Sequence, residues 1–420
     1  MADPIHLARA RRVMRRCDVL ARDSARPDAI HRLFLTPEHD RANRRVDRWM
    51  REAGLTTWRD RLGSQWGQTG SAAPTTERPI VIGSHLDTVP DAGRYDGVLG
   101  VLLGIEVAEV MAPLRAMMRH PLRVVAFGDE EGARFPATLM TSRFAAGSVD
   151  PAWADLRDRD GVTLADAMVG FGLDPDALAD APSGVDAAFY LEPHIEQDRC
   201  LERDAQPLGV VSGIAGAVRM TVTLHGAPAH AASAIADRRD AGSGAAEAVL
   251  RLEEYAHEHR ELRITIGRMT FGQGTVNVVP GTAEFTVDVR ATDDRRLARA
   301  VADVVGIVNA VAARRALTPV AATDHHAKAT TFGGHVTRRL GDAIEASTAT
   351  DTPHLWSIPG HDAMVFAENT DTGMVFIRSE GGHSHNPLER VAVEDVAAAL
   401  KVCVDTVFAL GAASSVRMAS

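Results

Sequence analysis

The stretch GSHLDTVPDAGRYDG carries three side chains that could act together on a metal ion. His85, Asp87 and Asp96 lie within twelve residues, directly after a short apolar run. On an extended chain His85 and Asp87 face the same way, so Asp87 can accept the second ring N–H of a metal-bound His85 and fix its tautomer. Asp96 lies beyond a turn and can return a carboxylate to the same place. Taken alone, the stretch is better explained as a surface turn, so a metal site needs ligands from elsewhere.

The stretch GDEEGARF adds two adjacent glutamates, Glu130 and Glu131, after a second apolar run. Neighbouring carboxylates repel each other, and burying one is costly unless it is paired or bound to a metal. Consecutive residues of an extended segment point in different directions, so one glutamate can bind a metal while the other handles a proton. The alternative is a solvated acidic turn.

Histidines in two further motifs complete a possible ligand set. His194 lies in YLEPHIEQ, and GGHSHNP contains His383 and His385. Each motif is ambiguous by itself, and His194 could be an ordinary histidine at the end of a strand. Together, imidazoles and carboxylates at the ends of separate predicted strands make a set that suits zinc or manganese, and a carboxylate can bridge two ions.

The elements that would position these residues follow a β-α-β order. RPIVIGSHLD is predicted to be a buried strand, residues 98–112 a buried helix, and PLRVVAFGDEEG a second buried strand. Continuous apolar strands in this order predict an α/β core with a largely parallel sheet, in which chemistry gathers at the carboxyl ends of strands. Residues 1–60 are expected to be helical, and residues 64–78 to form a surface loop.

A second domain is predicted inside the first. Between about residues 216 and 323, alternating strands and amphipathic helices follow the order β-α-β-β-α-β, the ferredoxin-like plan. The predicted domains are therefore a discontinuous catalytic domain, 1–213 and 327–420, and an insert, 214–326. This arrangement lets the C-terminal GGHSHNP meet the N-terminal GSHLD.

Composition excludes several classes of protein. A chain of 420 residues is long enough for two domains. A net charge of -10 argues against nucleic-acid binding, and the longest apolar run is broken by Glu106 and Glu109, which argues against a membrane span. Three scattered cysteines form no disulfide framework and predict a cytoplasmic protein. The Arg-rich start, ARARRVMRRC, is explained better as a solvated helix face than as a transit peptide.

The motifs, in their order along the chain, resemble those of the M20 metallopeptidase superfamily, and specifically its hydantoinase/carbamoylase branch. The similarity runs from RLFLTPEHDRANRRVDRWMREAGL through GSHLDTV, YDG, GDEEGARF, EPHIEQ, TVNVVPG, DVR and GHDA to SHNPLER. It implies an α/β fold with two domains: a mixed, mostly parallel sheet flanked by helices, as in zinc peptidases, and an inserted ferredoxin-like domain for lid closure and dimerisation.

The resemblance also implies a dimetal centre of two divalent ions, zinc or manganese. The implied terminal ligands are His85, Glu131, His194 and His385. Asp96 would bridge the ions, Glu130 would be the general base, and Asp87 would support His85. His383 falls where relatives usually have an apolar residue, so it is expected to be a neighbour of the centre and not a ligand.

The implied substrate contacts come from both domains. His230 would reach the substrate from the partner subunit of a homodimer, and Asn277 and Arg290 would hold the substrate carboxylate. Gln197 and His361 would line the pocket. The chain departs from relatives at HAASAIA, where they usually have HAGTTPM, and at HIEQDR, where they have HIEQGP.

The expected function is hydrolysis of the carbamoyl C–N bond of a small ureido acid, either an N-carbamoyl-L-amino acid or allantoate, by metal-activated water. One alternative is an M20 dipeptidase or N-acyl-L-amino acid deacylase. An alternative of another class is an inactive metal-containing protein that binds its ligand without turnover.

Overall fold

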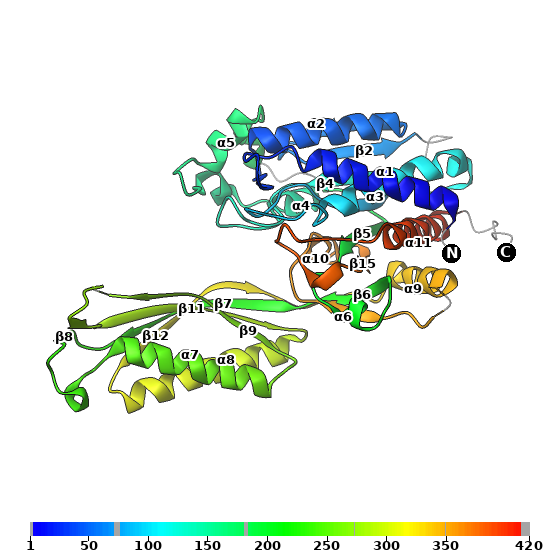
Figure 1. The fold of residues 1–420 in the computed structure, drawn as a ribbon. Coiled ribbons are helices and arrows are strands. Elements are labelled where there is room, and N and C mark those ends of the chain that lie inside the picture. Colours follow the sequence, from blue (N-terminus) through cyan, green and yellow to red (C-terminus); the bar gives the residue numbers. More distant parts are fainter. Residues whose placement is uncertain (1–2, 71–75, 180–183, 273, 349, 413–420) are drawn as a thin grey trace. The chain divides into compact units, whose positions relative to one another are not determined.

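The computed structural model describes residues 3–70, 76–179, 184–272, 274–348 and 350–412. The chain divides into two compact units. The first unit comprises residues 1–212, 332–355 and 361–420, and the second comprises 213–331 and 356–360. Figure 1 shows the elements of both in sequence colours. The roles predicted for the two domains stay predictions at this point.

The first unit is built on a mixed sheet. Its strands are β1 (Leu55–Arg59), β2 (Gln65–Thr69), β3 (Ile80–His85), β4 (Leu122–Phe127), β5 (Phe189–Ile195), β6 (Leu208–Ile214) and β15 (Asp371–Ile377). They follow the order β1-β2-β4-β3-β5-β15-β6, and β14 (His354–Ser357) also pairs with β6. Neighbours in the central set β4-β3-β5-β15 are parallel, whereas the outer pairings are antiparallel. The predicted fold class, a mostly parallel sheet flanked by helices, is confirmed.

Helices flank this sheet. The long ones are α1 (Pro4–Leu20), α2 (Pro37–Glu52), α3 (Val98–Met111), α9 (His335–Thr348) and α11 (Val393–Gly411). The short ones are α4 (Met140–Ala145), α5 (Leu164–Gly170), α6 (Cys200–Arg203) and α10 (Ala363–Phe366). Short 3-10 helices of this unit are η1 (Ala112–Met117), η2 (Pro151–Asp155), η3 (Pro175–Leu178) and η5 (Glu380–Gly382), whereas η4 (Ile235–Asp237) lies in the second unit.

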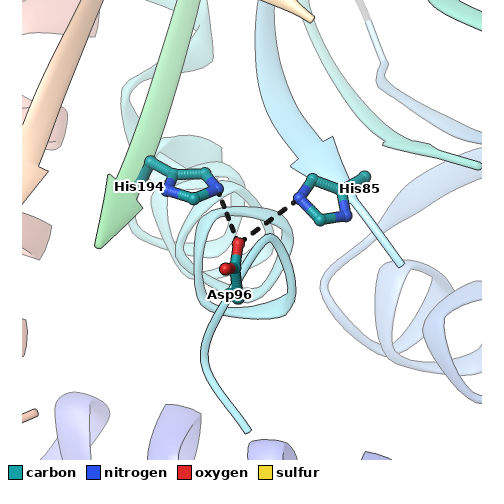
Figure 2. A group of neighbouring side chains, drawn as sticks. All are labelled: His85, Asp96 and His194. Atoms are coloured by element: carbon teal, nitrogen blue, oxygen red, sulfur yellow. Dashed lines mark ion pairs between the residues drawn. The ribbon is translucent and has the colours of Figure 1, made fainter. Parts of the chain in front are cut away.

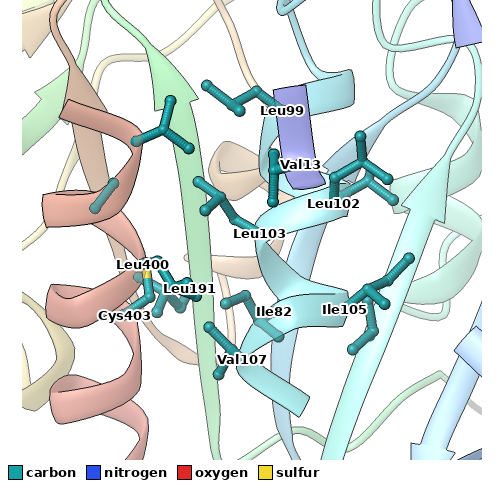
Figure 3. Packing of buried hydrophobic residues seen from close by; sticks show 14 of the residues in the cluster. Val13, Ile82, Leu99, Leu102, Leu103, Ile105, Val107, Leu191, Leu400 and Cys403 are labelled. Atoms are coloured by element: carbon teal, nitrogen blue, oxygen red, sulfur yellow. The ribbon is translucent and has the colours of Figure 1, made fainter. Parts of the chain in front are cut away.

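Helix α3 is the centre of the core. Apart from Glu106 and Glu109 it consists of apolar residues and glycine, which is the pattern of a buried helix. Figure 3 shows its Leu103 packed among Val13 of α1, Ile82 of β3, Leu191 of β5 and Leu400 of α11. The buried helix predicted over 98–112 is therefore confirmed. The first residues of α3 are buried and lie at the carboxyl ends of the parallel strands.

The Arg-rich start of the chain is only in part a solvated helix face: Arg11 and Arg15 are exposed, but three other arginines contact a buried glutamate. Arg9, Arg12 and Arg16 of α1 all contact Glu106, whose side chain is fully buried in α3. Arg12 Nε donates to Glu106 Oε1 at 2.6 Å, and Arg9 and Arg12 also contact Glu109. The glutamates that interrupt the apolar run thus bind the N-terminal helix to the core.

Replacing Glu106 by alanine should lower the free energy of unfolding by about 3 kcal/mol, because it takes the fully buried carboxylate away from three partly buried guanidinium groups. The midpoint of urea unfolding measures this loss. Glu52→Ala is the matched control, since Glu52 is 55% exposed and lies 3.7 Å from the same Arg16. Exposed pairs contribute about 1 kcal/mol or less. Equal losses in the two variants would contradict the role given to Glu106.

The second unit has an antiparallel sheet of order β12-β7-β11-β9. Its elements are β7 (Gly216–His225), α7 (Ala241–Glu258), β9 (Arg263–Phe271), β11 (Thr282–Ala291), α8 (Asp294–Arg314) and β12 (Thr318–Ala327). Short strands β8 (Ala229–His230), β10 (Val278–Val279) and β13 (Thr330–Thr331) accompany them. Alternate residues of β11 are buried against α7 and α8 around Phe285 and Val304. The element order matches the predicted β-α-β-β-α-β plan.

The sequence prediction is wrong over part of residues 1–78. The supposed helix end contains β1, and the supposed surface loop contains β2, an antiparallel partner of β1 and β4. Trp58 and Trp66 stack across this hairpin with ring centroids 6.0 Å apart. Pairing with the edge of the sheet therefore outweighs the polar composition of QWGQT. Residues 71–75 of the predicted loop lie outside the described residues.

Among the described helices, none combines the length and apolar character that crossing a membrane requires. The cytoplasmic location predicted from the cysteines stays a prediction.

Candidate metal centre

The carboxyl ends of the parallel strands bring the predicted ligands together. His85 is the last residue of β3, His194 lies at the end of β5, and Glu130 and Glu131 follow β4. Asp96 lies in the loop before α3 and is only 5% exposed. Gly97 caps α3 with a φ of 67°, and an added Cβ there would lie 2.5 Å from the His85 ring. The loop can therefore approach His85 only because residue 97 is glycine.

A first group consists of His85, Asp96 and His194. Figure 2 shows the three side chains pointing toward one another from β3, the loop before α3 and β5. His194 Nε2 lies 3.1 Å and His85 Nε2 3.6 Å from Asp96 Oδ1. All three side chains are almost completely buried. This is a buried site with two imidazole groups and one carboxylate group as possible ligands.

The tautomers of both imidazoles follow from their other ring nitrogens. His85 Nδ1 lies 3.1 Å from the carbonyl oxygen of Asp87, and His194 Nδ1 lies 3.0 Å from that of Ile195. A carbonyl oxygen only accepts hydrogen bonds, so each Nδ1 carries the proton. In the neutral rings each Nε2 then turns a lone pair toward the Asp96 carboxylate. Only a cation, either a proton or a metal ion, makes that arrangement favourable.

The separations suit a metal ion. Two ligand atoms about 2.1 Å from one zinc ion in tetrahedral geometry lie about 3.4 Å apart. The nitrogen–oxygen separations of 3.1 Å and 3.6 Å are close to this value. The donor types, buried imidazole and carboxylate, are those that zinc and manganese accept. The residues of this group therefore fit a divalent cation.

A second group shares Asp96 with the first. It consists of Asp96, Glu131 and His385. His385 Nε2 lies 3.1 Å from Glu131 Oε2 and 3.5 Å from Asp96 Oδ2. The two oxygens of Asp96 thus face different sets of ligands, as a bridging carboxylate requires. His385 has a φ of 53°, a left-handed conformation that is uncommon for histidine, and such strain is typical of functional positions.

Glu130 lies beside the first group without belonging to it. Its Oε2 is 3.8 Å from His85 Nε2, and together with His85 and Glu131 it forms a third possible ligand group. Asp87 fixes both glutamates, because its Oδ1 accepts a hydrogen bond from Glu130 N at 3.2 Å and its Oδ2 one from Glu131 N at 3.3 Å. Asp87 Oδ1 is also 3.5 Å from His85 Nδ1.

The pKa values of the side chains in the centre indicate that this cluster of buried carboxylates is stabilised by positive charge. Burial alone would raise the pKa of Asp96, but the facing His194 and His85 lower it well below its usual range. Burial raises the pKa of Glu130 well above its usual range; His85 opposes this shift and Glu131 adds to it. The hydrogen bond to Glu131 raises the pKa of His385 to about 9. Bound divalent cations would take the place of these protons.

Three residues that the sequence analysis missed also serve the centre. Ser384 donates its hydroxyl hydrogen to Asp96 Oδ2. Glu389 Oε2 accepts a hydrogen bond from the backbone N–H of Asp96 at 3.2 Å and another from that of Tyr95. Glu192 is fully buried two residues before His194. The signals available were weak: Ser384 lies between two histidines, Glu389 follows four residues after His385, and Glu192 shares a strand face with His194.

Gln197 and His361 are placed at the centre. Gln197 Nε2 donates to Asp96 Oδ2 at 3.0 Å and to Ser384 Oγ at 3.1 Å. His361 is 1% exposed, and its Nδ1 lies 3.8 Å from Glu130 Oε1. His383, in contrast, is exposed and belongs to none of the ligand groups formed by the described residues.

The remaining predicted residues belong to the second unit. The exposed His230 of β8 pairs with Val278 of β10, and Ala231 N donates to the carbonyl of Asn277 at 2.9 Å, so Asn277, in the turn directly before β10, lies beside the His230 segment. Arg290 donates from Nε and Nη2 to Asp288 at 2.8 Å and 3.2 Å, and from Nη1 to the carbonyl of Ile358 at 3.0 Å. It lines a cavity of about 620 Å³.

Comparison with known proteins identifies relatives over nearly the whole chain. Residues 81–409 match Peptidase family M20/M25/M40. The N-carbamoyl-L-amino acid amidohydrolase of Geobacillus stearothermophilus is 36% identical, over 91% of this chain and 93% of the relative. The probable allantoate deiminase of Oryza sativa subsp. japonica is also 36% identical, over 88% of this chain and 82% of the relative.

A solved structure agrees with these relatives. The amidase of the hydantoinase/carbamoylase family from Burkholderia multivorans is 30% identical, with a TM-score of 0.85 over 95% of this chain and 97% of that chain. The family match, the curated relatives and the shared fold lead to one conclusion. The chain belongs to peptidase family M20/M25/M40, in its hydantoinase/carbamoylase branch.

Proposed function

We propose that this chain is a metal-dependent amidohydrolase that cleaves the carbamoyl C–N bond of an N-carbamoyl-L-amino acid or of allantoate. The observation that carries the proposal is the pair of ligand groups that meet at Asp96, with the Glu130 carboxylate beside them. Relatives named for hydrolysis of these two substrate types support the choice of bond.

We propose that the centre holds two divalent ions, zinc or manganese. His85, Asp96 and His194 would hold one, and Asp96, Glu131 and His385 the other. When bound, such ions lower the pKa of water toward neutrality and polarise a carbonyl oxygen. The shared Asp96 supports two ions over one, because its Oδ1 faces His85 and His194 while its Oδ2 faces His385.

Glu130 is the residue proposed to move the proton. Its carboxylate would accept a proton from the water that adds to the ureido carbonyl carbon, and would then donate it to the nitrogen that leaves as the C–N bond breaks. Asp87 positions Glu130 by accepting a hydrogen bond from its backbone N–H. His361 Nδ1 lies 3.8 Å from Glu130 Oε1. Positive charge in the centre would lower the pKa of Glu130 so that it is a base at neutral pH.

The second unit is proposed to act as a lid and to bind the substrate carboxylate. Asp288 accepts from Arg290 Nε and Nη2, and the carbonyl of Ile358 accepts from Nη1, which leaves one N–H on each of Nη1 and Nη2 for a planar anion. Two parallel hydrogen bonds to a carboxylate suit a guanidinium group. Asn277 would contact the same carboxylate, while Gln197 and His361 would line the pocket in the first unit.

We further propose that the chain forms a homodimer in which the partner's second unit supplies His230. The exposure of His230 on a short two-stranded pairing supports this role, since its side chain is available to another molecule. Sedimentation should show a dimer, and His230→Ala should lower turnover without changing metal content. A fully active monomer would contradict the proposal.

The function is tested by ammonia release from N-carbamoyl-L-amino acids, allantoate and ureidoglycolate. The apoprotein, prepared with a chelator, should be inactive and should recover activity with zinc or manganese. Hydrolysis of dipeptides or N-acyl amino acids, with no ureido acid cleaved, would favour the dipeptidase or deacylase alternative. Binding of ureido acids without turnover by the metal-loaded chain would favour the inactive binding protein.

A further inference from the structure

The two strands that carry His85 and His194 lose their pairing with each other before they reach the metal centre, although β3 stays paired with β4 through His85 and β5 with β15 through Ile195. The β3–β5 ladder covers Ile80–Ile82 opposite Phe189–Leu191, three residues short of the histidines. Pro193, between that ladder and His194, has no N–H to donate. An added Cβ at Gly100 of α3 would lie 2.1 Å from the Pro193 carbonyl oxygen and 2.9 Å from Ser84 Cβ. The start of α3 therefore packs against both strands where their pairing has ended.

Glu192 lies at this gap and connects three segments of the site. Its side chain is fully buried and points to the same face of β5 as His194, two residues later. Its Oε1 accepts a hydrogen bond from Ser84 Oγ at 3.1 Å, directly before His85. Its Oε2 accepts from Tyr190 OH at 3.2 Å and from Ala363 N at 2.8 Å, two residues after His361.

We propose that Glu192 is a positioning residue that takes over from the backbone ladder and holds His85 and His194 at the separation of two ligands of one cation. The inference rests on the metal centre of the proposed function. Glu192 acts through hydrogen bonds, because within the described part of the chain it belongs to none of the candidate ligand groups. The same carboxylate keeps the segment of His361 next to the centre.

The substitution Glu192→Gln distinguishes the effect of the hydrogen bonds from the effect of the negative charge. Both donors at Oε2, Tyr190 OH and Ala363 N, need an oxygen, so the amide oxygen of Glu192→Gln takes that place. The amide nitrogen then faces Ser84 Oγ, whose hydroxyl can accept as well as donate. All three hydrogen bonds can form without the negative charge. Alanine removes all three.

The experiment measures the dissociation constant for Co²⁺ in the full chain by competition with a chelator, beside urea unfolding of the apoprotein. Glu192→Ala should weaken Co²⁺ binding by about 10–100-fold, the usual cost of losing an outer partner of a ligand. Ser84→Ala should act in the same direction by less, because it removes only one of the bonds. Glu192→Gln should bind Co²⁺ as the wild-type chain does.

Asp60→Ala is the matched control. Asp60 also accepts three hydrogen bonds, from Leu62 N, Ser64 N and Trp66 Nε1 at 2.9–3.0 Å, and all of them lie in the β1–β2 hairpin. It should lower stability and leave Co²⁺ binding unchanged. Wild-type affinity in Glu192→Ala and Ser84→Ala would overturn the inference, and so would equal losses in Glu192→Gln and Glu192→Ala.

The outcome is separable from that of the proposed function. If the metal-loaded chain hydrolyses no ureido acid but the variants show the expected order of Co²⁺ affinities, the positioning role stands and the substrate assignment fails. If ureido acids are hydrolysed and all variants bind Co²⁺ equally, the substrate assignment stands and the role of Glu192 fails.

Discussion

Glu130→Gln should lower kcat for ureido-acid hydrolysis by about 10²–10⁴-fold, the range that a positioned acid–base group contributes. The amide occupies the same space but can neither accept a proton from water nor return one to the leaving nitrogen. Glu130 lies 3.8 Å from His85, outside both groups that share Asp96, so metal content should stay at the wild-type level. Ammonia release and metal analysis of the same preparation provide the two readings.

Glu131→Gln is the contrasting variant. It lies next in the chain, is equally fixed by Asp87, and contacts His385 at 3.1 Å within the second ligand group. It should lose metal as well as activity, because an amide is a poorer ligand than a carboxylate. If Glu130→Gln keeps wild-type turnover, or if it loses metal as Glu131→Gln does, the division of roles between the adjacent glutamates is wrong.

The parallel sheet and the convergence of the motifs could be predicted because both depend on local patterns. The apolar strand ending in GSHLD and the mostly apolar helix over 98–112 leave few arrangements, and parallel strands present their carboxyl ends on one edge. His85, Asp96 and His194 therefore meet where the strand ends meet. Histidines and carboxylates are also rare enough at such ends to be noticed.

Glu389 and Glu192, which support the centre, could not be predicted, because most of their partners are distant in sequence and several of those partners are backbone N–H groups. Glu389 accepts hydrogen bonds from backbone N–H groups almost 300 residues away, at Tyr95 and Asp96. Any residue there would offer the same N–H. Glu192 similarly binds a serine, a tyrosine and a backbone amide. Nothing in the spacing of these residues distinguishes them from ordinary polar residues.

The strand β2 and the ion pairs between α1 and Glu106 could not be predicted for a related reason. QWGQT has the composition of a loop, and its pairing with β1 on one side and with β4 on the other makes it a strand. The arginines of α1 resemble a solvated face until Glu106, about ninety residues later, is placed against them. In both cases the long-range partner decides the structure, and the local sequence is compatible with either outcome.

His385→Ala should remove metal and activity, whereas His383→Ala should change little. His385 Nε2 faces Glu131 and Asp96 in the second ligand group, so its loss should weaken metal binding by more than the roughly 10–100-fold cost of losing an outer partner. His385 is 46% exposed, so the alanine variant should still fold. Metal content after dialysis and ammonia release measure the two effects.

His383→Ala is the internal control, because it changes the same residue type two positions away in the same loop. The His383 side chain is exposed and packs near Gly381, and the contact that its backbone makes, the carbonyl that accepts from Ser379 Oγ at 3.0 Å, survives the substitution. Unfolding curves of both variants should coincide with the wild type. Loss of metal in His383→Ala with retention in His385→Ala would reverse the assignment and place the second ion toward the other side of the GGHSHNP loop.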